Sequence, residues 1–226
     1  TDEVALYANY IEALTEISPP GRAANFDQVF PLVVSRQKEI GVKFELGDVL
    51  LTAALFEIRQ PNGLTDPASN VFSISGQQLN RGLELNAAGE VADGLRLLGG
   101  VTFLDASLTK TAVGETDGNK VPGIPTTNLV LYGEYDTPWV DNLTLTGRVT
   151  HASSTFFDQT NNQKISGWTK LDLGARYKFE RENSKPIELR FDVDNVLNEN
   201  YWASSARGFL AAGAPRTFKV SAAFEF

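Results

Sequence analysis

The sequence lacks cysteine altogether and contains a single histidine, His151. Without cysteine there is no disulfide, no thiolate metal site and no cysteine nucleophile. One histidine excludes histidine-rich metal clusters, and a net charge of −8 argues against a nucleic-acid partner, which requires a basic face. No run approaches the ~20 consecutive apolar residues of a membrane helix. A transmembrane β-barrel stays possible, because its strands need only ~9–11 alternating residues.

The sequence is instead dominated by alternation of apolar and polar residues. In "WTKLDLGARYKFE" the residues Leu171, Leu173 and Ala175 share one parity, while Lys170 and Asp172 share the other. A period of two predicts β-strands with one apolar and one polar face. About ten such strands are predicted, at Ala5–Leu14, Gln37–Leu46, Val49–Arg59, Gln77–Val91, Leu95–Lys110, Thr126–Tyr135, Leu143–Phe157, Trp168–Glu180, Ile187–Val196 and Ala214–Phe226.

The connections between these strands alternate between tight and long. Tight connections are "GD" at 47–48, "ADG" at 92–94, "WVDN" at 139–142 and "RENSKP" at 181–186. The segments between them, such as "TEISPPGRAANFDQVFP" and "QPNGLTDPASNVFSIS", are long. Short turns at one end and long loops at the other are typical of an up-and-down outer-membrane barrel, with the short turns periplasmic. We therefore predict an all-β, antiparallel, transmembrane barrel.

The polar parity carries many charges, which suits a wide, wet lumen and leaves the apolar parity for lipid. The charged positions are Lys170, Asp172, Arg176, Lys178, Glu188, Arg190, Asp192, Asp194, Lys219 and Glu225. Aromatic residues gather near strand ends, as interfacial girdles do: Tyr135, Trp139, Tyr177, Phe179, Phe224 and Phe226. Two other classes remain open on pattern alone, a soluble β-sandwich or propeller binding module and a passive outer-membrane porin.

Several stretches together resemble the C-terminal half of the barrel of a TonB-dependent siderophore receptor. They are "LYANYIEAL", "SRQKEIGVKFEL", "LLTAALFEIRQPN", "NRGLELNAAGEVADGLRLLGGVTFLDASL", "VPGIPTTNLVLYGEY", "DVDNVLNENYW" and "GAPRTFKVSAAFEF". The resemblance implies a 22-stranded plugged barrel, a TonB box that couples to the inner-membrane motor, and uptake of iron as a ferric siderophore. It implies an outer-membrane location among lipid and lipopolysaccharide. Residues 1–226 would then be the C-terminal portion of the barrel, with the plug and first barrel half absent.

The resemblance also gives the last strand a second role. In this family a C-terminal aromatic residue is the recognition signal for the outer-membrane barrel assembly machinery. The residues expected to carry that signal share one parity of the last strand: Phe218, Val220, Ala222, Phe224 and Phe226.

No catalytic constellation or resident cofactor is expected. His151 shares the parity of Val149 and should face lipid near the outer rim. "DVDN" at 192–195 opens like a calcium loop but has Leu197 where that loop requires glycine. We interpret its carboxylates as lumen-facing groups that pair with Arg190, Arg176 and Lys170.

Candidate ligand-binding residues are aromatic or cationic and lie in the long loops or at upper strand ends. A ferric siderophore is large, partly apolar and often anionic, so both stacking and charge attraction apply. The candidates are Phe156, Phe157, Tyr201, Trp202, Arg207 and Phe209.

Overall fold

The computed structural model describes residues 3–66, 68–111, 114–181, 184–205 and 209–224. Ten long strands form one antiparallel sheet in the order β1-β2-β3-β4-β5-β6-β7-β10-β11-β14. Their bounds are β1 Val4–Thr15, β2 Val33–Leu46, β3 Val49–Thr65, β4 Phe72–Ala92, β5 Leu95–Lys110, β6 Thr127–Asp136, β7 Leu143–Ala152, β10 Trp168–Arg181, β11 Ser184–Asp194 and β14 Thr217–Phe224. Among these residues no α-helix is long and apolar enough to cross a membrane.

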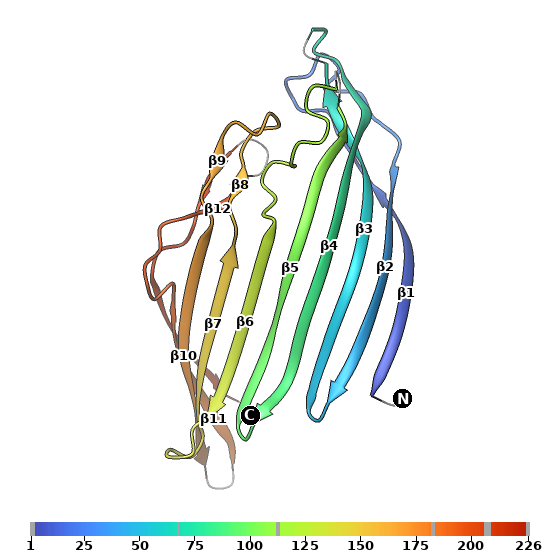
Figure 1. Cartoon of the computed structure of the whole chain (residues 1–226). Coiled ribbons are helices and arrows are strands. Elements are labelled where there is room, and N and C mark those ends of the chain that lie inside the picture. The colour runs from blue at the N-terminus through green and yellow to red at the C-terminus, as the bar shows by residue number, and fades with distance from the viewer. Residues whose placement is uncertain (1–2, 67, 112–113, 182–183, 206–208, 225–226) are drawn as a thin grey trace.

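The sheet is a single curved layer with two unlike ends (Figure 1). Short turns join the strands at the lower end, where both chain termini lie, and long loops stand at the upper end. Each long strand pairs with its neighbour in sequence, apart from two small hairpins in the upper loops. These hairpins are β8 (Thr155–Phe156) with β9 (Lys164–Ile165), and β12 (Trp202–Ser204) with β13 (Ala211–Ala212). The predicted up-and-down antiparallel architecture is confirmed.

The β3–β4 hairpin is longer than the sequence predicted. Residues 60–75 were expected to form a loop, yet β3 continues to Thr65 and β4 begins at Phe72. The first long loop supports this extension: the Asn25 side chain accepts a hydrogen bond from Phe72 N and donates one to Phe72 O, at 2.7 and 2.9 Å. The Phe30 ring meets the Phe72 ring edge-on at 5.4 Å. These tertiary contacts override the turn-like residues "PNG" at 61–63.

Three further predicted bounds are wrong at the upper end, the first because β2 begins at Val33 and not at Gln37. β7 stops at Ala152 and not at Phe157: Ser153 N donates to Thr127 O, but Thr127 N donates to the Ser153 side-chain hydroxyl and not to a backbone carbonyl, and the chain then turns into β8. The last strand begins at Thr217 and not at Ala214, since Pro215 has no N–H to donate to a ladder. The strand from Leu95 to Lys110 is as predicted.

The two faces of the sheet differ in curvature and in chemistry. On one face Arg176 of β10 reaches Glu134 of β6 across β7, at 3.1 Å. Side chains from strands that are not neighbours meet where a sheet curves toward them, so we call this face concave. The register places every described charge predicted for the lumen on it. On the opposite, convex face, Phe218 and Val220 are 66% and 78% exposed.

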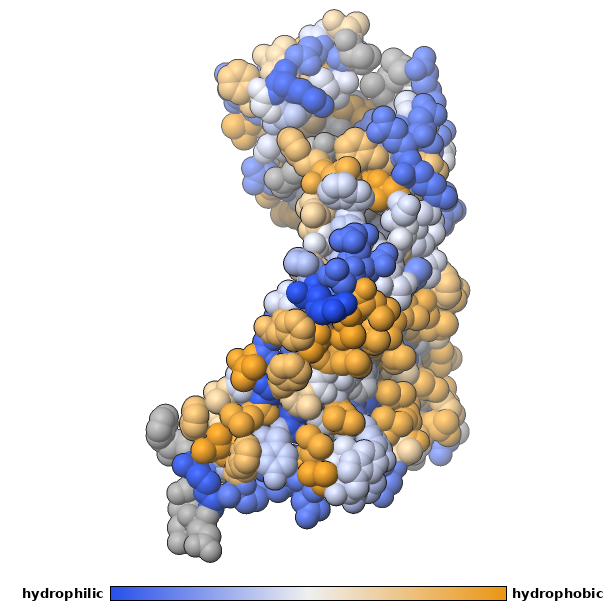
Figure 2. Space-filling view, turned by 90° about the vertical axis from the view of Figure 1, so that its left-hand side faces the viewer, coloured by the Kyte–Doolittle hydropathy of each residue, from blue (hydrophilic) through white to orange (hydrophobic). Residues whose placement is uncertain are grey.

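Figure 2 views the molecule from the side of β7 and β10. Hydrophobic residues cover much of its lower half, with hydrophilic residues at the lower margin. Aromatic rings cluster near this end: Tyr135 lies 5.9 Å from Trp139, and Tyr177 lies 4.5 Å from Phe179.

Buried side chains of the described residues lie mostly beneath the upper loops and not between two sheets. Leu108 is 1% and Ala106 is 3% exposed, and the backbone of residues 118–121 hydrogen-bonds to both. A β-sandwich buries the inner faces of two packed sheets against each other. The described strands form one layer, so the sandwich interpretation is wrong.

Candidate ligand-binding site

The concave face carries a network of ion pairs at fixed positions. Glu134 lies 3.1 Å from Arg176 and 3.2 Å from Arg96, and it accepts a hydrogen bond from the Tyr132 hydroxyl at 2.7 Å. The Arg176 side chain crosses β7 at Thr144 and Thr146, the residues of β7 opposite Arg176 and Glu134. The buried Nε of Arg176 has no hydrogen-bond partner among the described residues. The network thus holds the Arg176 guanidinium in a fixed position on the concave face.

A second set of charges surrounds Asp172, which is only 7% exposed. Its carboxylate lies 2.7 Å from Arg148 and 3.2 Å from Lys170, and it accepts a hydrogen bond from the backbone N–H of Asn195 at 2.7 Å. Burial of a carboxylate is tolerated where it is paired and hydrogen-bonded in this way. Asp172 therefore ties the top of β10 to the start of the last long loop.

The pairing predicted for the "DVDN" carboxylates is wrong in its partners. Asp194 of β11 pairs with Lys219 of β14, the strand next to β11. Two of the predicted partners, Arg176 and Lys170, lie on β10, on the other side of β11. Arg190 pairs with Glu188 at 2.6 Å, and Lys170 pairs with Asp172. The carboxylates do face the concave side, as predicted.

Sequence analysis missed the residue that organises the upper loop, Asn195. It is 1% exposed and has a φ of 53°, a backbone region that asparagine tolerates better than most residues. Its side-chain amide donates to Glu199 O and Ala214 O at 2.9 and 3.0 Å, and its Oδ1 accepts from Glu199 N at 2.8 Å. Both ends of the loop are thereby fixed. The only sequence signal was an asparagine directly after a strand.

Two of the predicted aromatic residues, Tyr201 and Trp202, lie in the loop that Asn195 closes, and they differ in how they are packed. Tyr201 lies against Trp168, with ring centroids 4.3 Å apart, and covers Gly213. Trp202 is 47% exposed. Trp202 and Phe157 line one cavity of about 450 Å³, together with Tyr201 and Leu210. The structure therefore brings three predicted residues from two different loops to one cavity.

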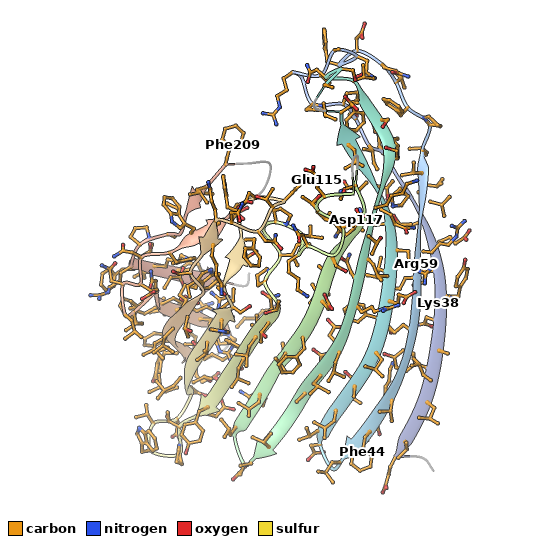
Figure 3. The ribbon with its side chains drawn as sticks, turned by 45° about the horizontal axis from the view of Figure 1, so that its top comes forward. Lys38, Phe44, Arg59, Glu115, Asp117 and Phe209 are labelled. Atoms are coloured by element: carbon orange, nitrogen blue, oxygen red, sulfur yellow. The ribbon has the colours of Figure 1, made fainter. Side chains whose placement is uncertain are left out.

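Two of the other predicted ligand-binding residues, Phe156 and Phe209, do not line this cavity. Phe156 pairs with Lys164 in the β8–β9 hairpin. Phe209 is 77% exposed and, in Figure 3, points away from the sheet at the upper end. Arg207 lies outside the described residues. All six residues remain predictions as ligand contacts.

A neighbouring cavity of about 250 Å³ adds a polar group that sequence analysis did not identify. It is lined by Trp202 and Trp168 and by Ser205, whose hydroxyl is buried and has no hydrogen-bond partner among the described residues. Because a buried hydroxyl without a partner is costly, this group is suited to a ligand or water at the same site.

Acidic residues also lie at the upper end, on two loops that hydrogen bonds between residues 119–120 and 159–161 join. Figure 3 shows Glu115 and Asp117 at the upper end, on the loop that follows β5, at about the level of Phe209. Asp158, in the loop between β8 and β9, accepts hydrogen bonds from the Thr160 hydroxyl and from the backbone of Gln163 and Asn162. These hydrogen bonds lower the pKa of Asp158 to about 2.

Two predictions about facing are consistent with the register. His151 lies on the convex face beside Val149, and its Nδ1 hydrogen-bonds the Thr169 hydroxyl at 2.8 Å. On β14 the residues Phe218, Val220, Ala222 and Phe224 share the convex face, opposite Val193, Phe191, Leu189 and Ile187 in register. Phe226 lies outside the described residues. Recognition of this strand by assembly machinery stays a prediction.

Comparison with known proteins bears directly on this fold and site. Residues 1–196 match the family model for the TonB-dependent receptor-like β-barrel. The chain is 41% identical, over its whole length, to the ferrichrome receptor FcuA of Yersinia enterocolitica, of which it covers 31%. It is 27% identical over 99% of its length to the ferrichrome outer membrane transporter/phage receptor of Escherichia coli K12, of which it covers 30%.

A solved structure agrees with these matches. The chain superposes on BauA, the ferric preacinetobactin receptor of Acinetobacter baumannii, with a TM-score of 0.86 and 38% identity, covering 100% of this chain and 35% of that one. The chain thus spans about a third of the length of the curated relatives it matches.

Proposed function

The chain belongs to the TonB-dependent receptor β-barrel family, and from that premise we propose that it supplies part of the wall and outer loops of an outer-membrane receptor for a ferric siderophore. The observation that carries this proposal is the whole-length match to receptors named for ferrichrome and ferric preacinetobactin. Iron is the cargo, carried inside the siderophore.

The site geometry supports separate roles for the outer loops and for the barrel wall of such a receptor. The cavity beside Trp202 and Phe157 offers aromatic surface at the mouth, where a siderophore arrives. The ion pairs around Glu134 give the concave face a fixed pattern of charged groups, which the proposed N-terminal plug would contact inside the barrel. Specificity then comes from the loops, and the wall itself needs no covalent chemistry.

The proposed receptor also needs parts that residues 1–226 do not supply. We propose a 22-stranded barrel closed by further strands and filled by an N-terminal plug, with a TonB box that transmits energy from the inner membrane. In this arrangement the convex apolar face contacts lipid. The apolar face of β14, with Phe226, is the signal that the barrel assembly machinery recognises.

The test uses the full-length receptor that contains this chain, purified in detergent. A panel of ferric siderophores, including ferrichrome and ferric preacinetobactin, is titrated against it, and uptake of radioactive iron is followed in cells with and without TonB. We expect saturable binding of at least one ferric siderophore and uptake that depends on TonB. Passage of small solutes that is independent of TonB, without siderophore binding, would instead indicate the passive porin.

A further inference from the structure

Three of the upper loops meet around one glycine above the concave face. Gly123 lies in the loop between β5 and β6, and its N–H donates a hydrogen bond to Phe156 O of β8 at 2.8 Å. Gly123 also lies against Ser205, which follows β12, because a Cβ at position 123 would be only 3.0 Å from the Ser205 hydroxyl oxygen. The φ of Gly123 is 76°, a conformation that glycine adopts readily. A glycine here thus permits close contact among the three loops.

The cavity of about 250 Å³ described above lies at this junction, and we call it the three-loop cavity. One of its walls is a single row of the concave face, since Asn128 of β6, Ala152 of β7 and Trp168 of β10 are partners in register. Its other walls come from the loops, and Figure 1 shows β8, β9 and β12 at the upper end of β7 and β10. The cavity therefore lies at the upper entrance to the concave face.

The lining of the three-loop cavity is polar but uncharged. Five side-chain hydroxyls line it, those of Ser153, Thr155, Ser166, Ser204 and Ser205, beside the indole rings of Trp168 and Trp202. An ionised ligand group would lose its hydration here without gaining a counter-charge, which is unfavourable. Amide and hydroxyl groups fit these walls, because a serine hydroxyl both donates and accepts hydrogen bonds and indole rings pack against apolar atoms.

The neighbouring cavity of about 450 Å³ differs in its chemistry. Trp202 lines both cavities and so lies between them. Lys164 and Glu199 line the larger cavity and do not line the three-loop cavity. Pockets for whole drug-sized ligands occupy about 300–1,000 Å³, so the three-loop cavity accommodates only part of a larger ligand.

Ser205 provides the observation that identifies the three-loop cavity as a binding site. Its side chain is buried, with 7% of the residue exposed, and its hydroxyl has no hydrogen-bond partner among the described residues. By contrast, the Ser153 hydroxyl in the same cavity accepts a hydrogen bond from Thr127 N at 3.0 Å. A buried hydroxyl without a partner costs stability, and a ligand group that bonds to Ser205 removes that cost.

We propose that the three-loop cavity binds an uncharged amide or hydroxyl group of the siderophore framework, and that Ser205 is a specificity-determining residue that hydrogen-bonds to it. This inference rests on the proposed function and adds which part of the ligand is recognised here, namely the organic framework and not the iron chelate. Because a group in this cavity contacts all three loops, its binding also holds the loops together over the concave face.

The test titrates purified full-length receptors with ferrichrome, an uncharged ferric trihydroxamate whose peptide ring carries amide groups. Ser205→Ala removes the hydroxyl and should weaken ferrichrome binding about tenfold, the effect of one buried hydrogen bond. Ser154→Ala is the matched control, because Ser154 is a half-buried serine between β7 and β8 that lines neither cavity. Its ferrichrome affinity should equal that of wild type. Heat-modifiable gel mobility shows that each variant has folded.

Hydrogen exchange separates ligand recognition from a purely structural role of Ser205. In wild type, saturating ferrichrome should slow exchange in residues 119–126, 153–167 and 198–205 together, and Ser205→Ala should reduce this slowing. Without ligand, the two proteins should exchange alike, because the hydroxyl has no partner among the described residues to lose.

Three results would overturn the inference while leaving the proposed function intact. They are equal ferrichrome affinity in wild type and Ser205→Ala, an equal loss of affinity in Ser154→Ala, and a wild-type receptor that binds another ferric siderophore but not ferrichrome. Faster exchange in ligand-free Ser205→Ala with unchanged affinity would show that Ser205 only packs within its loop. A wild-type receptor that binds no ferric siderophore would instead refute the proposed function.

Discussion

Replacement of Asn195 by alanine should open the upper loop while leaving the sheet intact. The change removes three side-chain hydrogen bonds, to Glu199 N, Glu199 O and Ala214 O. At about 1 kcal/mol each they contribute roughly 3 kcal/mol. Alanine at a φ of 53° adds about 1 kcal/mol of backbone strain. The loop should therefore lose about 4 kcal/mol of local stability.

Hydrogen exchange measures this loss directly, because local opening exposes the amides of residues 196–205 and 209–214. With a tenfold change per 1.4 kcal/mol, about 4 kcal/mol corresponds to roughly 700-fold faster exchange of the protected amides. The assay is hydrogen–deuterium exchange mass spectrometry of the full-length receptor, with peptides from β5 and β6 as internal references that should not change.

Asn198→Ala is the matched control within the same loop. Asn198 has the same φ of 53°, but it is exposed and its side chain accepts one hydrogen bond, from Arg216 N at 3.1 Å. Its replacement should cost about 2 kcal/mol at most, or roughly 25-fold in exchange. If the two variants exchange at the same rate, the three buried hydrogen bonds do not hold the loop, and the reasoning is refuted.

Three further changes test the upper end. Trp202→Ala should weaken ferric siderophore binding about tenfold by removing aromatic surface from the cavity, whereas Tyr201→Phe should not alter it; equal effects would contradict the assignment. Gly213→Ala should displace the Tyr201 ring, which lies 2.3 Å from the position of the added Cβ, and alter the fluorescence of Trp168; an unchanged spectrum would contradict this packing. The depressed pKa of Asp158 means that its carboxylate stabilises the β8–β9 loop fully above about pH 4 and loses that effect as pH falls toward 2. The hydrogen-exchange protection factors of residues 159–163, which are corrected for the intrinsic pH dependence of exchange, should fall over that range in wild type and be low throughout in Asp158→Asn; equal protection factors in the two proteins would contradict this role.

Strand identity and facing were predictable because alternation is a strong local signal. The segment 168–180 showed both faces of β10 correctly, and its charged parity lies on the concave side. The long β3–β4 hairpin was not predictable, since Asn25 and Phe30, which support it, lie more than 40 residues from Phe72 in sequence.

The candidate site was only partly predictable, for a related reason. Aromatic residues in loops suggested ligand contacts, but which of them stack on the scaffold depends on three-dimensional neighbours, as for Tyr201 on Trp168. The charges on the convex face were not predicted, because charge was taken to indicate the lumen. That rule fails above the apolar band, where Lys38 and Arg59 occupy the convex parity.

The single sheet ends at two strands that each have one neighbour, β1 with 12 residues and β14 with 8. Half of the peptide groups of an edge strand point away from the sheet, so β1 and β14 together carry about ten pairs of N–H and C=O groups that have no partner within the described sheet. In hydrocarbon each backbone group without a hydrogen-bond partner costs several kcal/mol. The total cost is far larger than the free energy of unfolding of an ordinary domain. An open sheet with these two edge strands is therefore unstable in a bilayer, and it can insert only together with strands that pair with β1 and β14. In the proposed outer-membrane receptor, insertion into the membrane and closure of the barrel are then a single cooperative event.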